Sequence, residues 1–572
     1  MAILRGSGKG EIIMKKQNGV MGCDIVSMNG QTRRTFLMKS GATALSLLAM
    51  PIAFAQHHGM NHGMNHGAGH MQGMGGSNGH GMAAGHSMSG MSENMGVPPM
   101  VREGYQLGVN TLTQQDINLM ASANQNLMTV DKMPGGNALP VLQKLRNESS
   151  VPGVFEGTLH VQAAKIELVP GIVTDILGYN GTIPGPQIVV YEGDKVSIKV
   201  INELAEETTV HWHGLLVPAM EDGNPQQAIK AGDSRIYHFE IPEGTAGTYW
   251  YHPHAHGSVA KQVYMGLAGT FIVKRRNEPF ADIPEKQLLV SDLKLHSDGK
   301  IAENSFFDWM NGREGQFTLV NGMLNPSVDI HGPTRLRIWN ACSARYLNLD
   351  FDFADTYLIA TDGGYIDAPV KIENRLLSPG ERIEVVVVPT RTGDVKFMNM
   401  SYNRHKMGPV SVTPSYTLAT FNMTKGADNY QLPQKLNDLP TYTAPKKSHH
   451  IEYTEVMNPN QLLFLINGKL HEMDRVDELV EQGNVEEWVV FNNTHMDHNF
   501  HIHGTQFMVQ SSEVNGVKTE ETLKSFRDTI NLQPYETVTL LMKQDFDGLR
   551  MYHCHILEHE TLGMMGQLEV KP

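Results

Sequence analysis

Four His-x-His pairs constrain the fold of this chain more than any other feature of its sequence. Two lie in the first half of the chain and two near its end: His211-Trp212-His213, His252-Pro253-His254, His501-Ile502-His503 and His553-Cys554-His555. In an extended strand, residues i and i+2 share a face, so each pair can present both imidazoles to one metal cluster. We therefore expect a β-scaffold that brings these distant segments together.

The last pair encloses Cys554, and His559 and Met564 follow closely. A thiolate, an imidazole and a thioether are the soft ligands of a blue-copper electron-transfer centre. Because residue i+1 of a strand points away from its two neighbours, Cys554 can hold one metal while His553 and His555 hold another. The segment predicts redox catalysis as well as metal binding.

With these motifs the chain resembles the multicopper oxidases, and in particular the bacterial copper-efflux, laccase-like members. The motifs begin at His211 (HWHG), Trp250 (WYHPHAHG), His498 (HNFHIHG) and His553 (HCHILEH). They occur in the order typical of that family, and the similarity spans residues 151–572.

The resemblance implies four copper ions and a ligand role for twelve residues. The type 1 copper, which takes electrons from the substrate, would be held by His498, Cys554, His559 and the axial Met564. The type 2 copper would be held by His211 and His501. The two type 3 coppers would be held by His213, His252 and His555, and by His254, His503 and His553.

Copper changes its charge by one electron, so a single ion cannot supply the four electrons that convert O2 to water. Three neighbouring ions fed by a fourth can, and the expected reaction couples four one-electron oxidations to this reduction. Asp222 and Glu560 lie beside ligand motifs, and the resemblance implies that they deliver protons. In the alternative, Asp222 opens a turn and Glu560 orients a ligand. His256 and His495 match non-ligand positions and are expected to lie outside the metal groups.

Composition narrows the class of protein. The 572 residues carry a net charge of -14, which gives no basic surface for nucleic acid, and no apolar run beyond the leader is long enough to span a membrane. Of the three cysteines, Cys23 lies in the expected leader, Cys554 is a predicted ligand, and Cys342 is left as a buried small side chain. The mature chain is therefore expected to have no disulfide.

Residues 1–55 are predicted to be a twin-arginine export signal. Arg33 and Arg34 precede Phe36-Leu37, and an apolar stretch ends at Ala53-Phe54-Ala55. This predicts export of the folded protein by the twin-arginine machinery to the periplasm. Translation starting at an internal methionine such as Met28 remains an alternative.

Residues 56–96 contain seven histidines and eight methionines among Gly, Ser, Asn and Ala. So little apolar bulk predicts disorder. Thioethers favour Cu(I) and imidazoles accept Cu(II), so we interpret the segment as a copper collector rather than a solvated spacer.

The rest of the chain is predicted to be all-β. Residues 97–150 are expected to form a linker with a short helix near 140–146. Short runs such as 195–200 and 269–274, separated by Gly, Pro and Asn, indicate β-sandwiches, and the resemblance specifies three cupredoxin-like domains with Greek-key topology at 151–280, 281–435 and 436–572. The middle domain has no histidine cluster and is expected to act as a spacer.

The predicted function is oxidation of Cu(I) for copper tolerance, with laccase-like oxidation of phenols. Fe(II) and Mn(II) remain alternative substrates, as a ferroxidase or a manganese oxidase would use. A copper storage protein is the alternative outside enzymes, but no ligand position is missing. A two-domain nitrite reductase is disfavoured because two predicted type 3 ligands flank Cys554.

Overall fold

The computed structural model describes residues 2–4, 11–17, 20–26, 122–426, 430–458 and 461–572, within two units that divide after Ser87. In the first unit an antiparallel sheet contains β1 (Ala2–Leu4), β2 (Glu11–Gln17) and β3 (Val20–Val26). The arginine pair of the predicted signal and the segment rich in histidine and methionine lie outside the described residues. Over the described ranges, no helix has the length and apolar character needed to cross a membrane.

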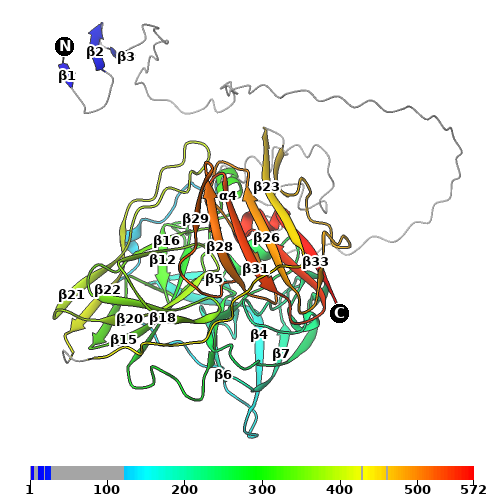
Figure 1. Cartoon of the computed structure of the whole chain (residues 1–572). Helices are drawn as coiled ribbons and strands as arrows, with labels where there is room; N and C mark the ends of the chain where they lie inside the picture. Colours follow the sequence, from blue (N-terminus) through cyan, green and yellow to red (C-terminus); the bar gives the residue numbers. More distant parts are fainter. Residues whose placement is uncertain (1, 5–10, 18–19, 27–121, 427–429, 459–460) are drawn as a thin grey trace, which may run out of the picture. The chain divides into compact units, whose positions relative to one another are not determined.

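Strands are the main regular elements of the second unit, as predicted, and they form three pairs of sheets (Figure 1). The first pair has the strand orders β5-β4-β7-β8 and β6-β10-β9. Its strands are β4 (Val154–Val169), β5 (Ile172–Tyr179), β6 (Gly185–Tyr191), β7 (Lys195–Asn202), β8 (Ser234–Glu240), β9 (Gly247–Tyr251) and β10 (Gly269–Lys274).

Alternation along these strands explains why the sheets pack face to face. In β7 every second residue is buried, including Val196, Ile198 and Val200. These side chains share one apolar cluster with Ile188 of β6 and Phe271 of β10, which belong to the other sheet. Two sheets that contribute to one core make a sandwich.

The second pair of sheets has the orders β13-β12-β11-β15-β20-β17-β18 and β14-β22-β21-β16-β19. Its strands are β11 (Glu285–Leu293), β12 (Phe317–Val320), β13 (Met323–Leu324), β14 (Ser327–His331), β15 (Thr334–Asn340), β16 (Leu347–Asp350), β17 (Asp355–Thr361), β18 (Gly364–Ile372), β19 (Asn374–Leu377), β20 (Arg382–Val388), β21 (Gly393–Asn399) and β22 (Tyr416–Thr424). Cys342 is buried in the core of this sandwich.

The third pair, coloured yellow through orange to red in Figure 1, has the orders β24-β23-β26-β31-β28-β29 and β25-β33-β32-β27-β30. Its strands are β23 (Ser448–Asn458), β24 (Gln461–Ile466), β25 (Glu478–Glu481), β26 (Val485–Asn492), β27 (His498–Ile502), β28 (Phe507–Val514), β29 (Val517–Glu520), β30 (Thr529–Leu532), β31 (Glu536–Lys543), β32 (Gly548–His553) and β33 (Met565–Lys571). The sheets thus fall within the three predicted ranges, while the domain boundaries themselves stay predictions.

All helices in the described part of this unit are short. They are α3 (Val259–Tyr264), α4 (Phe306–Asn311), α5 (Leu557–Thr561) and the 3-10 turns η1 (Val130–Lys132), η2 (Ala219–Glu221) and η3 (Pro225–Gln227).

The prediction of a helix near residues 140–146 is wrong. This segment is extended, and Lys144 forms a bridge with Gln187 of the first sandwich. The Leu145 N–H donates to the Gln187 carbonyl at 2.8 Å. Backbone bonds to an edge strand thus outweigh the weak local helical preference of the segment.

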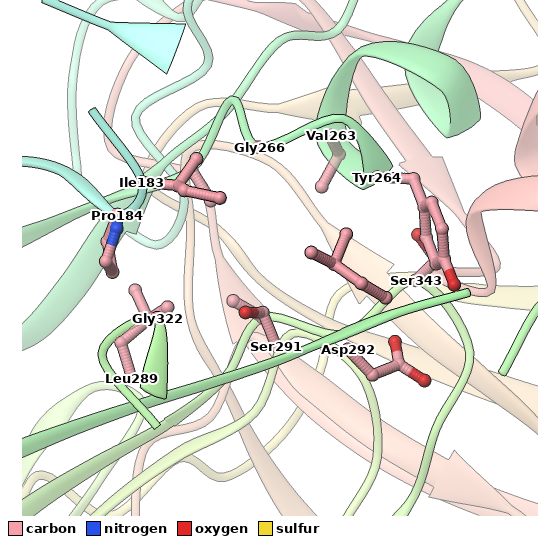
Figure 2. A pocket seen from close by; sticks show the side chains of 13 residues that line it. Ile183, Pro184, Val263, Tyr264, Gly266, Leu289, Ser291, Asp292, Gly322 and Ser343 are labelled. Carbon is pink, nitrogen blue, oxygen red and sulfur yellow. The ribbon is translucent and has the colours of Figure 1, made fainter. Parts of the chain in front are cut away.

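A small cavity of about 30 Å³ lies where residues of the first sandwich meet residues of the second (Figure 2). Its lining includes Ile183, Tyr264, Leu289, Asp292 and Ser343. Space of this size holds about one water molecule. No residue of the histidine motifs lines it, so it is not a candidate substrate site.

Candidate metal centre

Histidines from the first and third sandwiches meet in three buried groups, although they are far apart in the sequence. In each group the three ligand atoms lie within 4.8 Å of one another. The groups are His211, His213 and His501; His213, His252 and His555; and His254, His503 and His553.

The pairs are held at strand ends rather than on continuous strand faces. His211 and His252 form an isolated antiparallel bridge, with their backbone N–H groups donating at 2.8 and 3.2 Å. In the third sandwich, His501 of β27 lies opposite His553, the last residue of β32. The expectation that each pair shares one strand face is therefore too simple.

In one group three ring nitrogens converge. The Nε2 atom of His553 lies 3.1 Å from the Nε2 atoms of both His254 and His503. The Nδ1 atoms face outward, that of His553 toward the Cys554 carbonyl at 3.0 Å and that of His503 toward Asp222 at 3.2 Å. Outward donation leaves the inner nitrogens of these two rings as acceptors, and converging acceptors fit a cation.

The neighbouring group has the same character. His252 Nδ1 donates to the Pro253 carbonyl at 2.9 Å, and His252 Nε2 lies 3.3 Å from His213 Nδ1. The outer nitrogen of His213, Nε2, lies 3.0 Å from a carboxylate oxygen of Asp528. Both ring nitrogens of His555 are buried without a hydrogen-bond partner among the described residues.

Electrostatics keep these rings neutral. Burial, and then the neighbouring histidines, lower the pKa well below its usual value in six of them: His213, His252, His254, His503, His553 and His555. A neutral imidazole offers a lone pair, which is the form that binds a metal ion. The donor sets therefore fit copper or another ion that imidazole accepts.

A fourth group contains the cysteine. Cys554 Sγ lies 3.5 Å from His498 Nδ1 and 3.9 Å from His559 Nδ1, and all three residues are buried. The other nitrogen of His559, Nε2, donates to the Met310 carbonyl of α4 at 3.1 Å, which turns Nδ1 toward the sulfur. Burial raises the pKa of Cys554 to about 12, so a metal ion must displace the thiol proton.

Backbone hydrogen bonds hold Met564, the predicted axial ligand, beside His559 and Cys554. The Met564 N–H donates to the His559 carbonyl at 3.0 Å, and the Cys554 N–H donates to the Met564 carbonyl at 3.1 Å. Phe464 stacks on His559 with ring centroids 3.8 Å apart. Met564 is fully buried in the same apolar core as Cys554.

Both predicted acidic residues lie against the histidine groups. Asp222 has carboxylate oxygens 3.3 Å from His211 Nδ1 and 3.2 Å from His503 Nδ1. Glu560 has oxygens 3.4 Å from His254 Nε2 and 3.3 Å from His553 Nδ1. Both carboxyls are fully buried, and burial, with Glu558, raises the pKa of Glu560 well above its usual value.

Two residues that sequence reasoning missed also support the site. Asp528 accepts from His501 Nδ1 through its carbonyl at 2.9 Å and touches His213 through its side chain. Asn499 accepts the His555 N–H at 2.7 Å. Asn499 stands inside the motif that starts at His498, so its position could have indicated a role, whereas Asp528 carries no local signal.

The middle sandwich contributes directly, so the expectation of a mere spacer is corrected. Arg382 donates to both carboxylate oxygens of Asp528 at 2.7 Å. Gly380 approaches the rings so closely that an added Cβ would lie 3.2 Å from His213 and from His555. The middle sandwich thus braces the cluster through Arg382 and Gly380.

The two histidines predicted to lie outside the metal groups do so. His495 is largely exposed, and its Nδ1 lies 2.8 Å from Glu455. His256 is half-buried against another histidine, His471.

Comparisons with known proteins agree with this geometry. Two family models described as multicopper oxidase match residues 160–278 and 442–572. The multicopper oxidase mco of Staphylococcus aureus is 35% identical over 79% of this chain and 94% of its own length. A solved structure described as a multicopper oxidase from Campylobacter jejuni, a metallo-oxidase, has 44% identity and a TM-score of 0.76, and the match covers 78% of this chain and 98% of that one. The laccase-like CueO of Ochrobactrum sp. has 28% identity and a TM-score of 0.66 over 76% and 100% of the two chains.

Proposed function

The chain belongs to the multicopper oxidase family, and on this premise we propose that it oxidises a small reductant one electron at a time and reduces O2 to water. The observation that carries the proposal is the position of Cys554. Its sulfur belongs to one metal group, while His553 and His555, its immediate neighbours, belong to two others. A substrate side and an oxygen side are thus joined through adjacent residues.

We assign four copper ions to these groups. His498, Cys554 and His559, with Met564, hold the type 1 ion, and His211 and His501 hold the type 2 ion. The type 3 ions are held by His213, His252 and His555, and by His254, His503 and His553. When bound, copper supplies one-electron redox chemistry and binds oxygen. Metal analysis of protein that lacks residues 57–96 tests the assignment: at least four copper ions per chain are expected, and Cys554→Ser should contain one fewer and lose the blue colour.

The chain's own residues exclude water and position the ligands. All histidines of the three-histidine groups are buried, and Asp222 and Asp528 fix ring orientation through the outer nitrogens. Such fixed orientation keeps rearrangement small between oxidation states.

Glu560 and Asp222 are proposed to hold and deliver protons. Burial raises the pKa of Glu560 well above its usual value, which favours the protonated form of this carboxyl beside His254 and His553. General acid groups of this kind contribute on the order of 10²- to 10⁴-fold to a rate. The change Glu560→Gln or Asp222→Asn should therefore slow O2 consumption while leaving the blue absorption unchanged. Full oxygen-reduction rates in both variants would refute the proton role.

Cu(I) is the proposed physiological substrate, with copper tolerance as the biological role. Support comes from the copper-binding composition of residues 56–96 and from the metallo-oxidase named among the relatives. Deleting residues 57–96 should reduce Cu(I) oxidation at low copper and lower copper tolerance of cells. Unchanged tolerance and turnover would remove the collector role.

Phenol oxidation is a second candidate, favoured by one cavity. A pocket of about 790 Å³ is lined partly by Phe307, Asn311 and Gly312. The first two belong to α4, whose Met310 carbonyl accepts from His559. This volume suits a small aromatic ligand.

Turnover of Cu(I), Fe(II), Mn(II) and a phenol, each with and without added Cu(II), separates a cuprous oxidase from a ferroxidase, a manganese oxidase and a laccase. A protein that binds copper but oxidises none of them would be a storage protein.

We further propose export to the periplasm by the twin-arginine machinery, supported by Arg33 and Arg34 and the apolar stretch that follows. Replacing both arginines by lysine should retain the enzyme in the cytoplasm. Cell fractionation measures this, and unchanged periplasmic activity would refute the route.

A further inference from the structure

His256 and His471 form a pair of imidazoles outside the four metal groups. Their ring centroids lie 5.1 Å apart with the planes inclined by 52°. His256 precedes α3, and His471 lies between β24 and β25. Two chain segments of different sandwiches therefore bring two nitrogen donors together.

His471 differs from an ordinary buried polar residue in the environment of its ring. Its side chain is buried, at 1% exposure, and within the described ranges neither ring nitrogen has a hydrogen-bond partner. Buried polar atoms are normally paired, so both ring nitrogens of His471 are open to a ligand. Burial, with smaller effects of His256 and Arg475, lowers the pKa of His471 to about 3, which keeps the ring neutral.

We propose that His256 and His471 bind a soft monovalent metal ion, Cu(I) or Ag(I), between their rings. Cu(I) and Ag(I) accept two nitrogen donors in near-linear coordination. Among the residues that the structure describes, no carboxylate pairs with His471, and a divalent ion without a counter-charge is costlier to bury than a monovalent one. Arg475 lies near His471, but it is paired with Asp477 at 2.6 Å and with Glu472 at 2.9 Å, which offsets its charge.

The pair of His256 and His471 lies beside chain segments that carry ligands of two other metal groups. The His471 N–H donates to the Gly563 carbonyl at 3.0 Å, one residue before Met564. His256 follows His254 by two residues and is partly exposed, so an ion can reach it from the surface. A monovalent ion held here lies beside segments that carry both the cysteine group and a three-histidine group. The site is thus a holding position for Cu(I), and its existence does not depend on turnover.

Silver tests the site because it binds as Cu(I) does without being oxidised. The copper-loaded full chain is incubated with Ag(I), desalted and analysed for silver. His471→Phe and His256→Phe should each bind one silver ion fewer than the wild type. His450→Phe, a change at an exposed histidine of β23, should match the wild type. Binding by residues 56–96 is common to all four proteins and cancels in the comparison.

Anomalous diffraction from silver-soaked crystals of the wild type locates the ion. A peak between the rings of His256 and His471 is expected, and it should be absent in the variants. Silver content equal to that of the wild type in both phenylalanine variants would overturn the proposal. So would a wild-type map without the peak, which remains decisive even if a variant fails to fold.

Discussion

Replacing Asp528 by asparagine is expected to lower the free energy of unfolding of the copper-free protein by about 3 kcal/mol. Both oxygens of this carboxylate accept from the Arg382 guanidinium at 2.7 Å, and both side chains are fully buried. Removing one charge of such a pair leaves the other buried and poorly compensated, at a cost of about 3–5 kcal/mol. The lower end applies because Asp362 stays 3.5 Å from Arg382.

Urea unfolding of copper-free protein measures the change without the contribution of bound metal. Asp175→Asn is the matched control, since Asp175 pairs with Lys165 at the surface, with both side chains more than half exposed. Exposed pairs contribute about 1 kcal/mol or less, so this variant should unfold almost as the wild type does.

A double variant separates the lost charge from lost packing. Asp528→Leu together with Arg382→Met removes both charges and should recover part of the stability that Asp528→Asn loses. If the free energy of unfolding of Asp528→Asn lies within about 0.5 kcal/mol of the wild-type value, the Arg382 charge is compensated by other groups, and the reasoning from the buried pair is wrong.

Gly380→Ala should reduce the copper content but keep the blue colour, because the new methyl group would press on His213 and His555 at a backbone φ of +92°; full copper content would contradict this. Burial acts to lower the pKa of His449, but hydrogen bonds to Glu478 and Glu486 outweigh it and raise the pKa. The stability difference between wild type and His449→Phe should therefore be largest below pH 6.5 and shrink as the pH rises through the higher folded pKa, which denaturant titrations across that range would show. Removing copper with a chelator should lower Tm, since an ion at about 100 times its Kd stabilises by about 2.7 kcal/mol per site; equal Tm values would contradict occupancy.

Local sequence patterns predicted the strands well. The segments 195–200 and 269–274 lie in β7 and β10. The helix expected near residues 140–146 failed because hydrogen bonds to Gln187, a residue distant in sequence, hold the segment extended. Short segments with weak preferences are settled by such partners.

The predicted metal-binding residues carried a signal because their spacing is local. His553, Cys554 and His555 are consecutive, so the alternation of their side chains is enough to predict that the cysteine and the histidines belong to different metal groups. The supporting residues carried no such signal. Asp528, Arg382 and the Met310 carbonyl belong to separate segments, and nothing in their immediate sequence connects them with the histidines.

The sequence by itself determined the donor chemistry, which consists of imidazoles, one thiol and one thioether at spacings that suit copper, within segments of period-two alternation. Tertiary structure decided which nitrogen of each ring faces inward, because that depends on outer partners such as Asp222 and the Pro253 carbonyl. It also decided that the middle sandwich braces the cluster and that His256 meets His471. Side-chain chemistry and spacing are local properties, whereas orientation, burial and charge compensation arise only when distant segments pack together.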